Sequence, residues 1–140
     1  MKVLQPSDWM APRGYSNGVM TQVAVGDRLV FVGGQVGWNG QQQFETDDLA
    51  GQVRQALLNV MAILAEGGGK PEHIVRMTWY VTDKHEYVAA YPDIGKHYRE
   101  IVGRHFPPMS AVEVADLVED RAKVEIEVTA VIPASVSEGE

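Results

Sequence analysis

The stretch His105–Ile132, HFPPMSAVEVADLVEDRAKVEIEVTAVI, decides much of the fold. Within it, VEIEVTAVI at Val124–Ile132 alternates between two sets of residues, and strand side chains point to opposite faces with a period of two. One set is apolar and predicts a core face, whereas the other carries Glu125 and Glu127. A shorter alternating run, SAVEV at 110–114, predicts a second strand. We therefore expect two strands here and an acidic sheet face on which the function resides.

Length and composition limit the classes of protein to which this chain can belong. Its 140 residues, 45% of them apolar, predict one domain with an ordinary core. The net charge of −7 disfavours nucleic acid and anionic membranes as partners, because both require clustered Lys and Arg. The absence of cysteine excludes disulfides, thiolate catalysis and Cys-ligated zinc, and it favours a cytoplasmic location. No apolar run is long enough to span a bilayer, and we expect no secretory signal.

The segment before the first helix predicts two short strands. Val19–Val25 and Arg28–Val32 are apolar runs separated by a Gly-Asp pair at 26–27, which is typical of a two-residue hairpin turn. The Gly-Gly pair at 33–34 is expected to end the second strand. These glycines would also let another backbone or a ligand approach closely.

Two helices are expected, with a strand between them. Thr46–Glu66 carries apolar residues at three- and four-residue spacing, and Thr46 is a suitable N-cap. The strand is Ile74–Thr82, whose residues alternate in polarity. A second helix, capped by Asp83, is expected to end near position 103 and to break or restart at Pro92.

The resulting order, β-β-α-β-α-β-β, predicts an α+β fold whose mixed sheet carries both helices on one face. One domain would cover residues 1–133, followed by a polar, disordered tail at 134–140. The other sheet face would carry Arg76, Tyr80 and Glu125, which is too mixed for a core. Because a Tyr is unusual in bare solvent, a subunit interface containing pockets is predicted, and closed homo-oligomers are common.

Six segments together form a specific pattern, although each one alone would be weak. They are RGYSNGV (13–19), LVFVGGQVGWN (29–39), QVRQALLNVMAILAEGG (52–68), HIVRMTWYVTD (73–83), FPPMSAVEVADL (106–117) and KVEIEVTAV (123–131). From about Ala11 to Pro133 the chain resembles the RidA/YjgF family, the reactive-intermediate deaminases. The resemblance implies a chorismate mutase-like fold, a homotrimer, and small-molecule pockets at the clefts between subunits.

The resemblance also implies an activity and its residues. Active members hydrolyse enamines and imines, such as 2-aminoacrylate or 2-iminopropionate, to a keto acid and ammonia without a cofactor. A Glu at the position of Glu125 is linked to the water and proton transfers. A Tyr matching Tyr15 lines the pocket, with backbone groups of the turn that here contains Gly34 and Gln35.

The chain departs from the family pattern at the residue that binds the substrate carboxylate. Active members have Arg in the segment F-P-x-R-S, where this chain has Met109. A thioether cannot form the two parallel hydrogen bonds of a guanidinium. Losing them should weaken amino-acid-derived substrates by roughly ten- to a hundredfold. Gly33 and Ala111, which replace Ser or Thr and Cys, make the expected pocket more apolar.

Other residues are weaker candidates, and each has a simpler interpretation. Arg13 is a candidate replacement for the missing Arg, and the alternative is a surface loop residue. Tyr80 is a candidate ligand contact, or else it fills an interface. His105 is a candidate proton shuttle, or else it is a structural His. The other histidines lack the spacing of metal ligands, so we expect no metal.

These observations leave more than one function open. The first hypothesis is an imine or enamine hydrolase with a non-standard substrate, in which Glu125 positions water, Tyr15 and the turn orient the substrate, and Met109 favours a bulkier apolar group. The second is a trimer that binds a small metabolite without catalysis. The third is an interaction or chaperone-like protein in which the clefts have no role.

Overall fold

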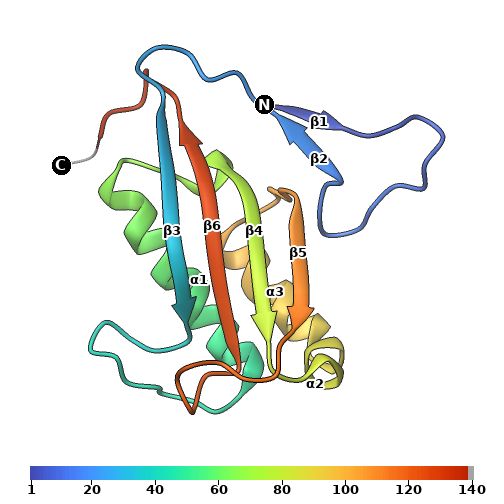
Figure 1. Ribbon diagram of the computed structural model, residues 1–140, viewed down its shortest axis with the longest axis vertical. Coiled ribbons are helices and arrows are strands. Elements are labelled where there is room, and N and C mark those ends of the chain that lie inside the picture. Colours follow the sequence, from blue (N-terminus) through green and yellow to red (C-terminus); the bar gives the residue numbers. More distant parts are fainter. Residues whose placement is uncertain (139–140) are drawn as a thin grey trace.

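The computed structural model describes residues 1–138 as a four-stranded sheet with helices against one face and a small hairpin to one side (Figure 1). The elements are β1 (Lys2–Leu4), β2 (Gly18–Met20), β3 (Arg28–Val36), α1 (Leu49–Glu66), the 3-10 turn η1 (Pro71–His73), β4 (Ile74–Val81), α2 (Lys84–Ala89), α3 (Tyr91–Ile101), β5 (Met109–Glu113) and β6 (Val124–Ile132). The predicted α+β class is confirmed, and so are the bounds of the strand at 124–132.

β6 is an inner strand of the sheet, whose order is β3-β6-β4-β5. It runs antiparallel to both β3 and β4, whereas β5 is parallel to β4, so the sheet is mixed as predicted. Val124, Ile126 and Val128 are buried beneath the helices. Glu125 and Glu127 alternate with them and are half-buried on the face without helices, which we call the open face.

Within residues 1–138 there are three α-helices where the sequence predicts two. The second predicted helix is divided at Ala90, and α3 begins at Tyr91 with Pro92 in its first turn. Asp83 caps α2, as predicted, because its carboxylate accepts hydrogen bonds from the N–H groups of His85 and Glu86. The N-cap of α1 is Asp48 rather than Thr46. None of the helices within residues 1–138 is long and apolar enough to cross a bilayer.

The predicted hairpin at residues 19–32 is wrong, although its turn is present. Gly26 has a φ of 91°, which glycine tolerates, and the turn closes with a bond from Asp27 N to Ala24 O. β2 pairs instead with β1, and this small sheet lies apart from the main sheet in Figure 1. β3 does not end at the Gly-Gly pair but continues past a register shift between Val32 and Gln35.

The C-terminal residues up to 138 are held by Arg28 at the start of β3. Its Nη2 donates to the carbonyls of Gly67, Val136 and Ser137 at 3.1, 2.9 and 3.2 Å. A cation in a distant strand thus provides hydrogen bonds to Val136 and Ser137 that the tail's composition does not reveal. The expected disorder of residues 134–140 stays a prediction. Residues 139–140 lie outside the described part of the chain.

Gln52 joins α1 to the segment that leads into β6. Its side chain is fully buried, and Nε2 donates to the carbonyls of Thr46 and Arg121 while Oε1 accepts from Lys123 N. All its polar atoms have partners, as burial of an amide requires. The backbone of Gly37 lies directly against Gln52, and a Cβ at position 37 would be 2.7 Å from the Gln52 carbonyl oxygen.

The substitution Gly37→Ala should therefore destabilise the fold. The added methyl group would meet backbone atoms that cannot move without disturbing the start of α1, and overpacking of this kind costs about 1–3 kcal/mol. Urea unfolding followed by circular dichroism measures the change. Gly40→Ala is the matched control, because a Cβ there meets no atom within 4 Å. Equal stability of the two variants would contradict this account of Gly37.

Candidate functional site

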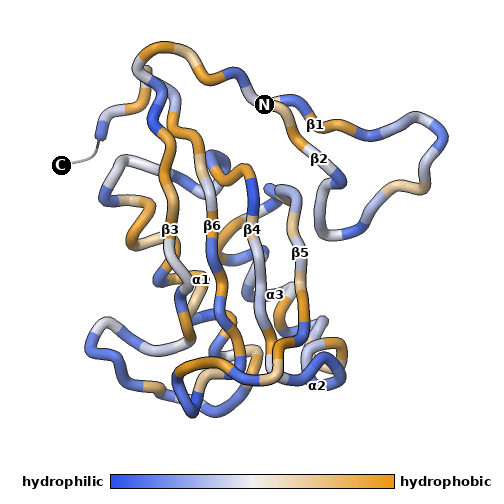
Figure 2. The backbone as a smooth tube through the Cα atoms, in the orientation of Figure 1, coloured by the Kyte–Doolittle hydropathy of each residue, from blue (hydrophilic) through white to orange (hydrophobic). Residues whose placement is uncertain are grey.

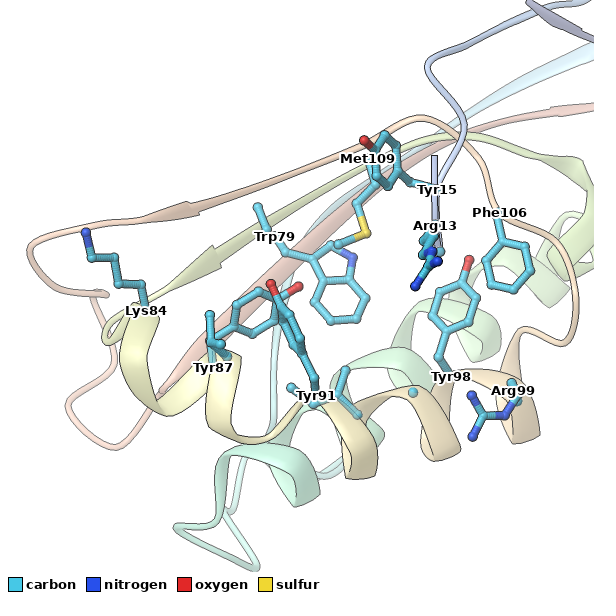
Figure 3. Close-up of a pocket in the computed structure, with 15 residues that line it drawn as sticks. Arg13, Tyr15, Trp79, Lys84, Tyr87, Tyr91, Tyr98, Arg99, Phe106 and Met109 are labelled. Atoms are coloured by element: carbon cyan, nitrogen blue, oxygen red, sulfur yellow. The ribbon is translucent and has the colours of Figure 1, made fainter. Parts of the chain in front are cut away.

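A cavity of about 710 Å³ lies between strand β4 and the edge strand β5 on one side and helices α2 and α3 on the other (Figure 3). The loop at 13–15 lies at its mouth. The cavity is on the helix side of the sheet, because Trp79, Met109 and Ala111 line it, and Trp79 belongs to the core. Its volume is within the range of about 300–1,000 Å³ that is usual for small-molecule sites.

The loop at the mouth is held in place by Ser16. Its Oγ donates to Phe106 O at 2.5 Å and its N–H donates to Pro107 O, although the two segments are 90 residues apart in the chain. Gly14 has a φ of 77°, a conformation that turns the loop and that few other residues adopt. These contacts bring Arg13 and Tyr15 to the cavity beside Met109.

Aromatic side chains form much of the cavity wall. Tyr87 and Tyr91 meet edge to face at 5.2 Å, and Tyr98 stacks on Phe106 at 5.6 Å. The rings of Trp79 and Tyr87 are 6.3 Å apart. Burial raises the pKa of Tyr87 to about 12 and raises that of Tyr98 further, so both are neutral phenols at ordinary pH. The wall therefore suits a planar, apolar group.

The charged groups around the cavity are all cations. Arg13, Lys84 and Arg99 line it, and none of the lining residues is Asp or Glu. The side chains of these three residues form no ion pair within the described chain. This concentration of positive charge is notable in a protein with a net charge of −7, and it favours an anionic ligand.

The other predicted site residues lie elsewhere. Glu125, on the open face, makes no hydrogen bond or ion pair with the described residues, and a Cβ added to Gly34 would be 2.5 Å from its Oε2. Gln35 donates from Nε2 to the backbone of the same turn. Tyr80 donates to Glu127 Oε1 at 2.8 Å, and this bond raises the pKa of Tyr80. Within one chain the predicted site residues therefore form two separate groups. One group, which includes Arg13, Tyr15 and Met109, lines the cavity. The other includes Glu125 and lies on the open face.

Several other ionisable residues have structural contacts. Glu113 accepts from Lys84 N at the start of α2, and Glu127 binds Tyr80. The ring nitrogen Nε2 of His105 lies 2.7 Å from Ile74 O, which agrees with a structural His rather than a proton shuttle. Across residues 1–138 no cluster of His, Asp and Glu has the arrangement of a metal site.

Sequence reasoning missed part of the cavity. Tyr87, Tyr91, Tyr98 and Trp79 line it, and none of the four is among the candidates that the sequence offers. The available signal was the number of tyrosines on one helical stripe, because their hydroxyl groups suit a cavity better than a closed core. Arg99 gives no such signal, since an exposed Arg on a helix is ordinary.

Comparisons with known proteins agree with the resemblance seen in the motifs. The model of the family described as Endoribonuclease L-PSP matches residues 10–132. The chain belongs to this family, the RidA/YjgF family. A RutC family protein from Synechocystis is 30% identical over 135 residues, with 95% of this chain and 98% of that protein covered.

Two further relatives carry more specific information. The 2-iminobutanoate/2-iminopropanoate deaminase of Escherichia coli is 35% identical over 106 residues, which cover 74% of this chain and 79% of that protein. A Rid-family protein of unknown function from Yersinia pestis has a crystal structure that superposes with a TM-score of 0.78 at 28% identity, covering 92% of this chain and 96% of that one. The RidA-like fold is therefore confirmed.

The substitution Ser16→Ala should release the loop that carries Arg13 and Tyr15. Loss of one hydrogen bond should lower the free energy of unfolding by only about 1 kcal/mol. Amide hydrogen exchange at residues 13–16 should nevertheless become markedly faster. Ser7→Ala serves as the control, since no hydrogen bond of its side chain is found in the described structure. If exchange in the loop is unchanged in Ser16→Ala, the bond to Phe106 O does not hold the loop.

Proposed function

We propose that this protein is a cofactor-independent imine or enamine hydrolase that releases ammonia and prefers a substrate other than the small amino-acid imines. The observation that carries the proposal is the carboxylate of Glu125, half-buried and without a partner among the described residues, beside the backbone of Gly34. The relationship to the deaminase of Escherichia coli supports the reaction class.

The chemistry requires one water molecule and one group that moves protons. Glu125 holds the water and accepts a proton as the oxygen bonds to the imine carbon, and it returns the proton to nitrogen. The resulting carbinolamine then passes its hydroxyl proton to nitrogen by way of Glu125 and loses ammonia as the C–N bond breaks and the C=O bond forms. Imine and water are thus converted to a carbonyl compound and ammonia, with no net gain or loss of protons or electrons.

A homotrimer would unite the two groups of site residues. The open face carries Leu29 and Phe31, which are 52% and 74% exposed, and contact with a neighbouring subunit would cover them. In the cleft formed in this way, Glu125 would lie beside the substrate. Tyr15 and the backbone of Gly34 and Gln35 would orient it.

The remaining residues would set the substrate preference. Met109 offers an apolar contact where an Arg would bind a carboxylate. Arg13 is the cation in the mouth loop and the proposed replacement for it. Tyr80 would fix Glu127 by its hydrogen bond and leave Glu125 as the free carboxylate.

A second candidate is a trimer that binds a metabolite without hydrolysing it. It is favoured by the separation of Glu125 from the cavity within one chain, because a ligand in the cavity need not meet a catalytic group. The two candidates differ in ammonia release.

The substitution Glu125→Gln tests the proposed catalytic role of Glu125. Imines are generated in situ with an amino-acid oxidase, and their decay and the release of ammonia are followed with and without the protein. We expect faster decay of bulky imines and a loss of about a hundredfold or more in Glu125→Gln. Glu66→Gln is the control, since Glu66 lies at the end of α1, away from both groups. Unchanged activity in Glu125→Gln removes its proposed role, and if no imine decays faster the hydrolase proposal fails.

The second prediction concerns Met109. The substitution Met109→Arg should increase the rate for 2-iminopropionate by roughly tenfold or more, because a guanidinium restores charge-assisted bonds to the carboxylate. The rates for 2-iminopropionate and for a bulkier imine are compared in both proteins. An equal effect on the two imines would show that position 109 does not set the preference.

The third prediction concerns assembly. Sedimentation equilibrium should give the mass of a trimer for the native chain and a lower mass for Phe31→Glu, because a carboxylate would be buried in the interface. Val118→Glu is the matched control, as Val118 is 95% exposed in a loop. A monomeric native protein would remove the clefts on which the proposed site depends.

A further inference from the structure

The cavity contains a buried hydrogen-bond donor without an acceptor. Trp79 is 1% exposed, and its Nε1–H has no partner among residues 1–138. Leaving such a group unpaired is unfavourable, and an unpartnered donor in a native structure requires an explanation. Figure 3 shows the indole nitrogen on the edge of the ring toward Met109. A ligand oxygen in the cavity would provide the missing acceptor.

The guanidinium of Arg13 extends into the same cavity from the mouth loop, between Trp79 and Tyr98 in the view of Figure 3. Tyr98 is not a free donor, because its hydroxyl group already donates to His105 O at 2.6 Å. Arg13 and the Trp79 N–H are therefore available donors near Met109, together with the hydroxyl of Tyr15. Arg99 and Lys84 lie further along α3 and α2 and add to the positive potential.

The walls indicate the shape of the rest of the ligand. Tyr15 and Tyr91 are 43% and 52% exposed at the mouth, so their rings are available for contact. Tyr87 and Phe106 present further aromatic surface to the cavity. A three-carbon acid would fill a small part of 710 Å³ and would touch few of these rings. A planar aromatic group would stack on them or meet them edge to face.

We propose that this cavity binds the carboxylate of an aromatic acid, with Arg13 and the Trp79 N–H holding the carboxylate and the tyrosines enclosing the ring. Met109 then contacts the ring instead of the charge. The further assignment of aromatic α-imino acids as the substrate class rests on the proposed hydrolase function, whereas the binding itself does not.

The test is calorimetric titration of the native protein with phenylacetate. Phenylacetate should bind at least tenfold more tightly than acetate, which lacks the ring, and than 2-phenylacetamide, which lacks the charge. Arg13→Met should weaken phenylacetate binding by roughly ten- to a hundredfold, as expected for a charge-assisted hydrogen bond. Arg54→Met, on the exposed side of α1, is the matched control and should bind as the native protein does.

A spectroscopic measurement tests the role of Trp79, since Trp79 variants would disturb the core. The protein has three Trp residues, and Trp9→Phe and Trp38→Phe identify the indole N–H resonance of the third by elimination. That resonance should move downfield on addition of phenylacetate and remain unchanged with 2-phenylacetamide at the same concentration. A resonance that does not move with phenylacetate would remove Trp79 from the proposal.

Other outcomes separate this proposal from the hydrolase. If phenylacetate binds through Arg13 while no imine decays faster, the ligand class stands and the hydrolase fails. If 2-iminopropionate is hydrolysed but phenylacetate binds no more tightly than acetate, the aromatic ligand class is wrong. If Arg13→Met and Arg54→Met bind phenylacetate with equal affinity, Arg13 does not hold the carboxylate.

Discussion

Four consecutive backbone carbonyls, from His105 to Pro108, hold the candidate site together. They accept hydrogen bonds in turn from Tyr98 Oη, Ser16 Oγ, Ser16 N and Met77 N. The two prolines in this segment have no N–H, so their carbonyls are their only strong hydrogen-bonding groups. Helix α3, the N-terminal loop and β4 therefore converge on one short segment. The position of Met109, which follows directly, is set by all three.

The two faces of the sheet divide the chemistry of the protein. On the helix side, the cavity combines aromatic walls with unpaired cations and the buried N–H of Trp79. On the open face, Glu125 has no partner among the described residues, while Glu127 is bound by Tyr80. Because Met109 lies on the helix side with Trp79 and Glu125 lies on the open face, a site using both would draw on more than one subunit. Assembly and activity are thus linked in the proposed function.

The family resemblance implies that Met109 stands where active members have Arg, and this difference would change what the cavity can recognise. An Arg at the start of β5 would supply two strong donors that Met109 lacks, but Arg13, Arg99 and Lys84 supply positive charge to the cavity. These cations project from the loop and from the helices, so a carboxylate would bind further from β5 than an Arg at position 109 would place it. The aromatic rings beside them then provide space and contact for a larger substituent. The same fold would in this way catalyse the same class of reaction, imine or enamine hydrolysis, on a larger substrate.

The sequence by itself determined the local elements and the family. Alternation fixed β6, the Asp83 cap and the helix restart at Pro92 follow from short-range rules, and the motifs identified the relatives. Only the tertiary structure decided the pairing of β1 with β2, the hydrogen bonds of Arg28 with the C-terminal segment, and the cavity itself. These features depend on hydrogen bonds and contacts between residues far apart in the chain, such as Ser16 with Phe106, and no periodicity within a short window encodes them. Arg13 was recognisable as a candidate because it lies in the same short motif as Tyr15. Arg99 and the unpaired N–H of Trp79 were not recognisable, because only tertiary contacts bring them to the cavity.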